Sequence, residues 1–177
     1  MIRIIKIAVN LLVLLVVTLA AQQAVTKKFE HLKAAREQAS PVTAQMRQTQ
    51  LDCLARNIYY EAGSEPFEGK VAVAQVTINR TESGQFPSDI CKVVYQKNVV
   101  YEKVFCQFSW YCENPNGALK PMNGPIYTES MEVAKKVLLE GFRLPDLKNA
   151  LYFHGDYVQP GWNKKPVAKI GRHIFYN

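Results

Sequence analysis

The sequence predicts an α+β domain behind a short apolar N-terminal segment. Three stretches carry apolar residues at helical spacing: 51–61, 67–80 and 127–141. Three shorter stretches are β-prone: 104–111, 150–154 and 170–176. About 125 residues remain once the N-terminal segment is set aside, which is enough for one domain with a core of its own.

The first helix is expected to end at Glu61. Leu54 and Ile58 lie on its apolar face, and at about 100° per residue Glu61 falls beside Leu54 at the edge of that face. Burial raises the pKa of a carboxyl because it disfavours the charged form, and a protonated Glu can give a proton to a leaving group near neutral pH. An ordinary solvated residue in the last helical turn is the alternative.

A Gly-Ser-Glu-Pro turn separates the first helix from the second. Ser64 or Glu65 is expected to cap the second helix, with Pro66 in its first turn. The two helices therefore meet at Glu61. Glu65 lies at a helix start, where the dipole stabilises an anion, so we assign it this capping role and not a catalytic one.

The third helix and the tail complete the predicted framework. Thr128 is the expected N-cap of the helix at 127–141, and Gly141 is its expected terminator. The tail supplies a β-prone run at 150–154, a turn-rich stretch at 155–166 and a final strand at 170–176. These two strands are expected to pair in a small antiparallel sheet.

Several motifs in a fixed order give the chain a resemblance to a known family. The run LDCLARNIYYEAGSEPFEGKVAVAQVTINR at 51–80 resembles the spore-cortex-lytic (SleB-type) cell-wall hydrolase family. Four later motifs fit the same resemblance: FPSDICKVVY at 86–95, CQFSW at 106–110, ALYFH at 150–154, and Trp162 followed by IGRHIFY at 170–176. The resemblance covers essentially everything from residue 51 onward.

The resemblance implies a lysozyme-like, transglycosylase-like fold with helices and a small antiparallel sheet flanking a glycan cleft. The activity that it implies is that of a lytic transglycosylase on peptidoglycan strands. We expect no cofactor and no metal. The family's catalytic Glu matches Glu61. One departure is that Gly63 and Ser64 stand where many relatives have Arg-Gly.

The segment 104–111 is expected to be a strand that lines the cleft. It would place Gln107 and Ser109 on one face, where they can hydrogen-bond sugar hydroxyl and acetamido groups. Trp110 offers a flat apolar face to a pyranose ring. Simple core packing is the alternative, and it fits the two Phe of this segment better than Trp110. Within the resemblance, Tyr152, His154 and His173 are cleft-shaping or structural groups, and Tyr152 and His154 are the further cleft residues expected to bind substrate.

The expected mechanism begins with proton transfer from Glu61 to the oxygen between N-acetylmuramic acid and N-acetylglucosamine. The resulting carboxylate then acts as a base. Attack by the muramoyl 6-hydroxyl gives a 1,6-anhydro sugar, whereas attack by water gives a reducing end, as in a muramidase. A two-carboxylate hydrolase needs a partner about 5 to 9.5 Å away, and the sequence offers no convincing one, although Asp156 stays open.

Two other classes of function are weighed against this one. His154, Asp156 and His173 suggest a zinc-dependent amidase or peptidase with Glu61 as base, but their spacing matches no known metal motif. The other class is a non-catalytic module that only binds peptidoglycan.

Residues 1–24 are predicted to be a signal peptide or membrane anchor. Arg3 and Lys6 flank the start of an apolar run at 7–21. These 15 residues fall short of the roughly 20 that span a bilayer, which favours a cleavable peptide. The domain is then exported to the periplasm or cell envelope, and it is anchored to the inner membrane if the segment stays uncleaved.

A polar tether at 25–49 is expected to connect this segment to a catalytic domain at 50–177. Ser40 and Pro41 interrupt two short helical pieces of the tether. The 22 basic and 15 acidic residues give a net charge of +7. The basic residues are scattered and no nucleic-acid motif is present, so we expect attraction to an anionic envelope and no nucleic-acid partner. We expect the protein to be a monomer.

Four cysteines in a chain with an export signal predict two disulfides. Three pairings are open. Cys106 and Cys112 flank a short segment and are favoured as one pair, which leaves Cys53 to bond Cys91. A zinc site is the rival, but there is no paired Cys-x-x-Cys spacing and no nearby His.

Overall fold

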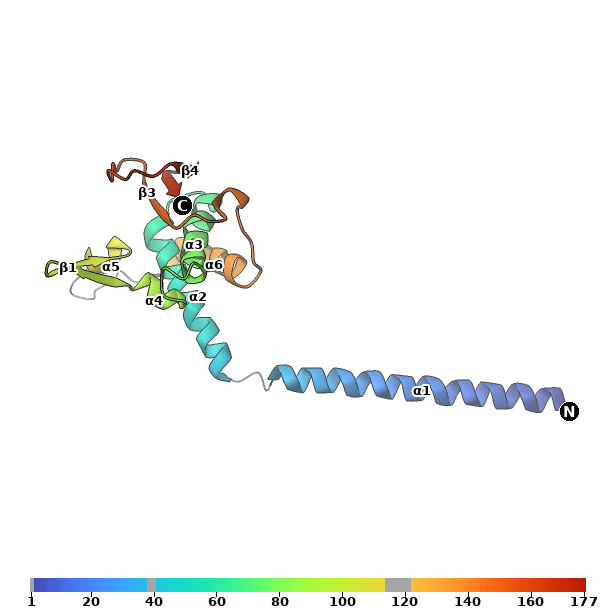
Figure 1. Cartoon of the computed structure of the whole chain (residues 1–177). Helices are drawn as coiled ribbons and strands as arrows, with labels where there is room; N and C mark the ends of the chain where they lie inside the picture. The colour runs from blue at the N-terminus through green and yellow to red at the C-terminus, as the bar shows by residue number, and fades with distance from the viewer. Residues whose placement is uncertain (1, 38–40, 114–121) are drawn as a thin grey trace. The chain divides into compact units, whose positions relative to one another are not determined.

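The computed structural model describes residues 2–37, 41–113 and 122–177 (Figure 1). Its contacts divide the chain into two units, Met1–Gln45 and Met46–Asn177, which are described separately. Ser40, one of the two residues expected to interrupt the tether, lies outside the described residues.

The first unit consists of helix α1 (Ile2–Glu37) and the first residues of α2 (Pro41–Ala62). Within α1, the stretch Leu12–Glu30 is long and apolar enough to cross a membrane by length and composition, with a mean hydropathy of 1.3 and none of it buried. The stretch has 19 residues. Signal sequences and membrane anchors both have this character.

The second unit is built around helix α3 (Phe67–Glu82), which is buried from Gly69 to Arg80. Around it pack α2, the short α4 (Ile90–Val94) and α6 (Gly124–Leu138). The main core contains apolar residues from all four helices: Leu54, Ala55, Ile58, Val71, Ala74, Ile78, Val93, Val94, Val133 and Val137. The apolar stripes expected on the first two helices therefore face each other in the core.

The start of α3 differs from the expected one. Its N-cap is Pro66, and no side chain caps the helix. The Glu65 carboxylate instead accepts a hydrogen bond from the backbone N–H of Arg172 at 3.0 Å. The prediction that Ser64 or Glu65 caps α3 is wrong, because the buried Glu65 carboxylate is used to join the α2–α3 turn to the C-terminal sheet.

The segment at 104–111 is a strand only in its first part. Strand β1 (Lys97–Val100) pairs with β2 (Lys103–Cys106) in an antiparallel hairpin, after which Ser109–Glu113 forms the short helix α5. Gln107 and Ser109 are thus not on one strand face. Of the two Phe expected in the core, Phe108 is buried, but Phe105 is exposed on the hairpin.

Helix α6 begins earlier than expected. Its N-cap is Asn123, and a Pro occupies the first turn. Thr128 lies inside the helix and donates its hydroxyl proton to the carbonyl of Gly124, so its assignment as N-cap is wrong. Gly141 follows the helix with φ 71°, the left-handed conformation suited to a terminator.

A three-stranded antiparallel sheet has the order β3-β5-β4, from β3 (Tyr152–Gly155), β5 (His173–Tyr176) and β4 (Pro166–Ile170). The expected pairing of the two tail strands is confirmed, with Phe153 opposite Phe175. The final strand at 170–176 is wrong in its bounds, because Gly171 (φ 56°) turns the chain and makes a hairpin of β4 and β5.

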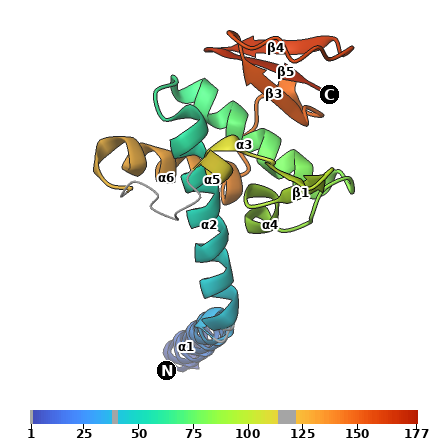
Figure 2. The same ribbon diagram turned by 90° about the vertical axis from the view of Figure 1, so that its left-hand side faces the viewer.

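The sheet lies at one end of the helical body, and the β1–β2 hairpin projects from another side (Figures 1 and 2). A second small core joins the sheet to α3 through the 3-10 helix at Pro145–Leu147. It consists of Ala72, Val76, Leu147, Ala150 and Phe175. The fold is therefore α+β, as the sequence predicts.

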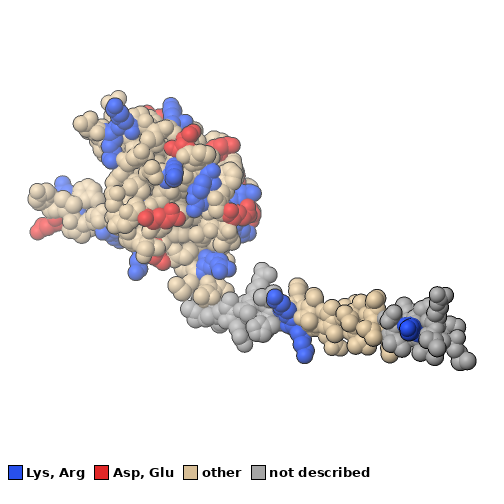
Figure 3. Space-filling view, turned by 45° about the vertical axis from the view of Figure 1, so that its right-hand side comes forward, with Lys and Arg blue, Asp and Glu red and all other residues tan. Residues whose placement is uncertain are grey.

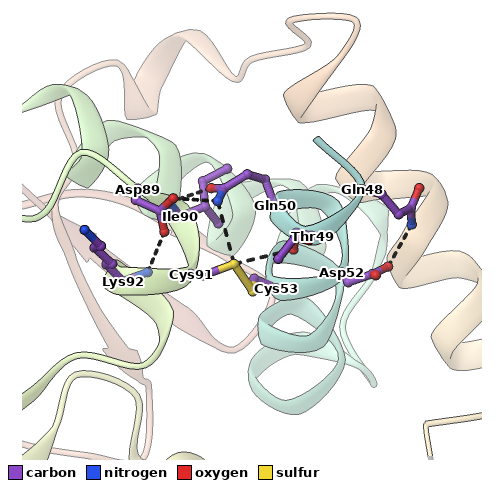
Figure 4. The surroundings of a disulfide bond; sticks show 9 residues. All are labelled: Gln48, Thr49, Gln50, Asp52, Cys53, Asp89, Ile90, Cys91 and Lys92. Carbon is purple, nitrogen blue, oxygen red and sulfur yellow. Dashed lines mark hydrogen bonds between the residues drawn. A yellow bond between two sulfur atoms is a disulfide. The ribbon is translucent and has the colours of Figure 1, made fainter. Parts of the chain in front are cut away.

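Two disulfides are present, Cys53–Cys91 and Cys106–Cys112. The first ties α2 to α4, where Gln50 also reaches across to the Asp89 carboxylate and the backbone N–H of Ile90 (Figure 4). The second closes the segment that leads from the hairpin into α5. Basic and acidic side chains are interspersed on the visible face of the second unit (Figure 3).

Candidate active site

A cleft of about 430 Å³ opens between the helical body and the C-terminal sheet. All six site residues expected from the sequence line it: Glu61, Gln107, Ser109, Trp110, Tyr152 and His154. They come from α2, from the segment between β2 and α5, from α5 itself and from β3. The structure thus brings together residues that are up to 93 positions apart in the sequence, which is the difference between 154 and 61.

A second hollow of about 460 Å³ adjoins the cleft. The two hollows share four lining residues: Tyr60, Glu61, Trp110 and Glu113. Glu61 therefore lies where the two hollows meet. A linear polymer bound along both hollows would pass the Glu61 carboxyl at an internal bond and not at an end.

The surroundings of the Glu61 carboxyl favour its protonated form. The carboxyl lies in the last turn of α2, partly buried, and burial raises its pKa to about 7. The Arg80 guanidinium acts in the opposite direction and the Glu113 carboxylate in the same direction. Near neutral pH both the protonated and the ionised forms of the carboxyl are therefore populated, so it can both give and take a proton.

Arg80 is the charged neighbour of Glu61 on α3. Its side chain is only 3% exposed, and its Nε donates to the carbonyl oxygen of Leu151 at 2.8 Å. The guanidinium carbon lies 5.2 Å from the ring centre of Phe86 and 5.0 Å from that of Phe108. Helical periodicity placed Arg80 at the end of a buried stripe, but it gave no sign that the group faces a cleft.

Trp110 is held more deeply than expected. It is 5% exposed, and its ring stacks on Tyr60 with centres 4.6 Å apart. Its indole N–H donates to the side-chain oxygen of Asn57 at 3.1 Å, and Asn57 in turn donates to Thr77 at 3.2 Å. Trp110 therefore lines the cleft as part of a rigid aromatic wall, and one of its faces is already covered by Tyr60.

His154 has both ring nitrogens engaged. Its Nδ1 lies 2.8 Å from the carbonyl oxygen of Gly155, and its Nε2 lies 2.8 Å from the hydroxyl of Tyr176. Because a carbonyl oxygen only accepts, Nδ1 carries the proton. The imidazole stacks on the Tyr176 ring, with an interplanar angle of 24°. These contacts hold β3 against β5 and fix the imidazole in the cleft wall.

The three groups of the zinc hypothesis do not form a ligand set. Asp156 is exposed and pairs with Lys169 at 3.0 Å, and a hydrogen bond from Lys169 holds the pKa of the Asp156 carboxyl below its usual value. No group of three or more His, Cys, Asp or Glu side chains placed to bind a metal occurs in the described ranges. His154 and Asp156 thus have other partners, and His173 lines the cleft.

Sequence reasoning missed Glu113 and used Trp162 only as part of a motif. Glu113 ends α5 and lines both hollows with Glu61. Trp162 is 44% exposed, lines the cleft and makes edge contacts with the rings of Tyr152, His154 and Tyr176. Both come from segments without regular periodicity, so no pattern marks them.

A partly buried carboxyl that lines a cleft, on a helical frame with a small antiparallel sheet, is typical of the class of lysozyme-like domains. Within that class, the chain belongs to the cell wall hydrolase family, whose family model matches residues 64–176. Glu61 stands just before the matched range. The fold and the family that the sequence resemblance implied are confirmed.

The curated relatives are spore cortex-lytic enzymes. The one from Halalkalibacterium halodurans is 28% identical over 145 residues, which cover 80% of this chain and 38% of the relative. The one from Bacillus cereus is 30% identical over 132 residues, covering 72% of this chain and 44% of the relative. The chain thus spans less than half the length of these two relatives.

Two solved structures resemble the fold. The catalytic domain of the Bacillus cereus SleB protein superposes with a TM-score of 0.53 at 27% identity, covering 73% of this chain and 91% of that domain. The catalytic domain of the germination-specific lytic transglycosylase SleB from Bacillus anthracis gives a TM-score of 0.54 at 26% identity, with coverages of 73% and 95%. The similarity thus extends over nearly all of each catalytic domain.

Proposed function

We propose that the domain at 50–177 cleaves the glycosidic bond between N-acetylmuramic acid and N-acetylglucosamine in peptidoglycan, as a lytic transglycosylase. The observation that carries this proposal is the Glu61 carboxyl, with a pKa of about 7, between two open hollows. The relative from Bacillus anthracis is itself described as a lytic transglycosylase. Residues 1–24 serve as signal peptide or anchor, and 25–49 as the tether.

Glu61 acts first as the acid. It protonates the glycosidic oxygen while positive charge develops at the sugar's anomeric carbon. The carboxylate left behind then accepts the proton of the muramoyl 6-hydroxyl, which closes the 1,6-anhydro ring. One carboxyl group serves both steps because its pKa lies near the working pH.

The other cleft residues position the strand. Gln107 and Ser109 supply hydrogen-bonding groups, while Trp110, Tyr152 and His154 shape the aromatic wall. The geometry gives no reason to assign a bond-breaking role to any of them. We therefore assign substrate positioning to these five residues.

Glu113 favours a second candidate, a muramidase. It is the other carboxyl that lines both hollows with Glu61, and an inverting hydrolase uses a second carboxylate to activate water. The two candidates differ in product. A transglycosylase leaves a 1,6-anhydro end, whereas a muramidase leaves a reducing end.

The test is mass spectrometry of peptidoglycan fragments released by the full chain and by its Glu61→Gln and Glu113→Gln variants. We expect 1,6-anhydro products whose rate falls about 10²- to 10⁴-fold in Glu61→Gln. Glu113→Gln serves as the matched control and is expected to leave the product type unchanged. Reducing ends that disappear with Glu113→Gln would establish the muramidase instead.

Digestion in the presence of a chelator tests for a metal-dependent amidase, and a cell-wall binding assay tests for a non-catalytic binding module. Chelator-sensitive release of stem peptides would support a metal-dependent amidase, and binding to cell walls without any cleavage would support a binding module. We expect neither result. Cleavage that survives the chelator and depends on Glu61 supports the glycan-cleaving function.

We also propose that the protein is exported and acts in the periplasm or cell envelope. The support is the apolar stretch Leu12–Glu30 near the N-terminus, together with the spore cortex-lytic relatives. Fractionation of cells that produce the full chain tests this. Recovery with the membrane at full length indicates an anchor, recovery as a shorter soluble periplasmic form indicates cleavage, and recovery in the cytoplasm would contradict the proposal.

A further inference from the structure

Arg80 is a buried cation for which the described part of the chain provides no ion-pair partner. Its side chain is 3% exposed, and it takes part in none of the ion pairs within 4.0 Å that the described residues form. Burying a charge without a partner is costly, so buried guanidinium groups are normally paired. An oxygen acceptor from outside the chain would remove this cost.

The guanidinium is fixed in place and keeps a free donor. Nε is bound to the carbonyl oxygen of Leu151, and the Phe86 and Phe108 rings lie 5.2 and 5.0 Å from the guanidinium carbon. Nη1 is buried and has no hydrogen-bond partner in the described residues. Arg80 lines the cleft with Glu61, so this residue forms part of the wall that a bound strand would touch.

The charge of Arg80 is uncompensated when the site is ready to react. Glu61 must be protonated to act as the acid, and a neutral carboxyl does not balance a guanidinium. Burial lowers the pKa of Arg80 to about 10, so the group still carries its proton at neutral pH. Glu61 therefore leaves the Arg80 charge unbalanced while the site awaits substrate, and Glu113 is the other carboxylate that lines the cleft.

We propose that Arg80 binds the free lactyl carboxylate of a muramoyl residue, so that the cleft selects glycan strands whose stem peptides have been removed. This inference rests on the proposed function. A guanidinium forms charge-assisted and often bidentate hydrogen bonds with a carboxylate. N-acetylglucosamine has no anionic group, and the lactyl group of muramic acid is anionic only when no peptide is attached to it by an amide.

The proposal also places the enzyme in a reaction sequence. Water must first cleave the amide between the lactyl carbonyl and the first amino acid, which yields a carboxylate on the sugar and an amine on the peptide. An amidase-class reaction therefore supplies the preferred substrate.

The test compares three strands of equal length as substrates for the full wild-type chain. One is free of peptide, one keeps its stem peptides, and one is free of peptide but has its lactyl carboxyls converted to methylamides. A charged hydrogen bond in the cleft predicts that kcat/KM for the peptide-free strand is about 10- to 100-fold higher than for the stem-bearing and methylamide strands, mainly because its KM is lower. The methylamide strand is the sharper comparison, because it removes the charge with little added bulk.

Arg80→Gln should bring the ratio between the peptide-free and methylamide strands close to one, and Arg80→Lys should keep part of it. Arg143→Gln, which alters an arginine outside the cleft, is the matched control and should keep the full ratio. Melting curves check that each variant is folded, and the three-strand comparison with wild type decides the question even where Arg80→Gln does not fold.

Equal rates on the peptide-free and methylamide strands would overturn the role of Arg80 while leaving the proposed function intact. Absence of cleavage on all three strands, or cleavage that Glu61→Gln leaves unchanged, would overturn the proposed function and this inference with it. A preference for the stem-bearing strand would also overturn the inference.

Discussion

The two sides of the cleft are built in different ways. Glu61 and Arg80 come from α2 and α3, whose apolar residues form the centre of the core. The facing side consists of the short segment from Gln107 to Glu113 and the edge of the C-terminal sheet, where Tyr157 and Trp162 are 77% and 44% exposed.

From this difference we expect the helical side to carry the proton transfer and the facing side to bind the substrate. Packing sets the electrostatic surroundings of the acid, because burial is the main cause of its raised pKa. The facing side has little core of its own and depends on specific tethers, such as Cys106–Cys112 and the hydrogen bond from Trp110 to Asn57. Damage to the helical side should therefore appear in stability and proton transfer, and damage to the facing side in substrate affinity.

The largest stability effect is expected from removal of Cys53–Cys91 on the helical side. The bond joins positions 38 apart, and loop-closure entropy predicts a loss of about 4 kcal/mol of unfolding free energy in the Cys53→Ala, Cys91→Ala double variant. Urea unfolding of the full chain measures it. Well below the unfolding midpoint, KM should stay within about twofold of the wild-type value, since neither cysteine lines the cleft. A loss below about 1 kcal/mol would mean that the hydrogen bonds of Gln50 hold α2 to α4 without the disulfide.

The second largest effect is a pH-dependent loss of unfolding free energy caused by the Glu61 carboxyl. The pKa of Glu61 is raised from 4.5 to about 7 in the folded state, so the folded protein binds more protons than the unfolded chain between these values. Stability conferred by this group is therefore full below pH 4.5 and is lost as the pH rises to 7, by about 3 kcal/mol. Glu61→Gln should remove this loss and be more stable than wild type at pH 8, but not at pH 4.

Unfolding free energies at pH 4 and pH 8 check this, with the exposed Glu68→Gln as control. The activity of the wild type should fall above pH 7, as the acid form of Glu61 is lost. Equal stability of Glu61→Gln and wild type at pH 8 would show that burial does not disfavour the Glu61 carboxylate.

The third effect concerns the disulfide of the facing side. Cys106 and Cys112 are only 6 positions apart, so their replacement by Ala should cost about 2 kcal/mol of unfolding free energy, half the loss expected for the other bond. KM should nevertheless rise several-fold, because Gln107, Ser109 and Trp110 lie between the two cysteines. Kinetics of both double variants side by side test the comparison. The comparison between the two sides fails if the variant without Cys53 and Cys91 loses more substrate affinity than the variant without Cys106 and Cys112.

The helical side of the cleft could be predicted from sequence because its signal is periodic. The spacing of Leu54, Ile58 and Glu61 placed the carboxyl at the edge of a buried stripe, and the structure agrees. Periodicity reports only which face of a helix is buried. It could not show that the buried Arg80 would lie beside Glu61, since that depends on how α2 and α3 pack.

The facing side was predicted less well, although one error was avoidable. An extended strand of six residue steps spans about 20 Å, whereas the disulfide holds the Cα atoms of Cys106 and Cys112 at 5.7 Å. A strand at 104–111 and this disulfide were therefore incompatible from the start. Strand β4 was missed for another reason: its hairpin turn at Gly171 lies within a run of β-prone residues that looks continuous in sequence.

The smallest effect is expected from Trp162, which probes recognition alone. The indole makes edge contacts with three rings, and its ring centre lies 6.1 Å from that of Tyr152, 5.6 Å from that of His154 and 5.6 Å from that of Tyr176. The residue is nevertheless 44% exposed. We expect the open surface to stack on a sugar ring of the strand. Trp162→Ala should then raise KM about tenfold, equivalent to about 1.4 kcal/mol, with kcat within about twofold and unfolding free energy within about 1 kcal/mol of wild type.

Steady-state kinetics on glycan strands, with Trp162→Phe as the conservative variant, separate this role from a purely structural one. A stacking role predicts that Phe restores most of the KM, since a flat ring is kept. Tyr101→Ala is the matched control, because Tyr101 is 95% exposed on the β1–β2 hairpin and does not line the cleft. A fall in kcat at unchanged KM would instead place Trp162 at the bond that breaks, and the facing side would then share in the chemistry that we assign to α2 and α3.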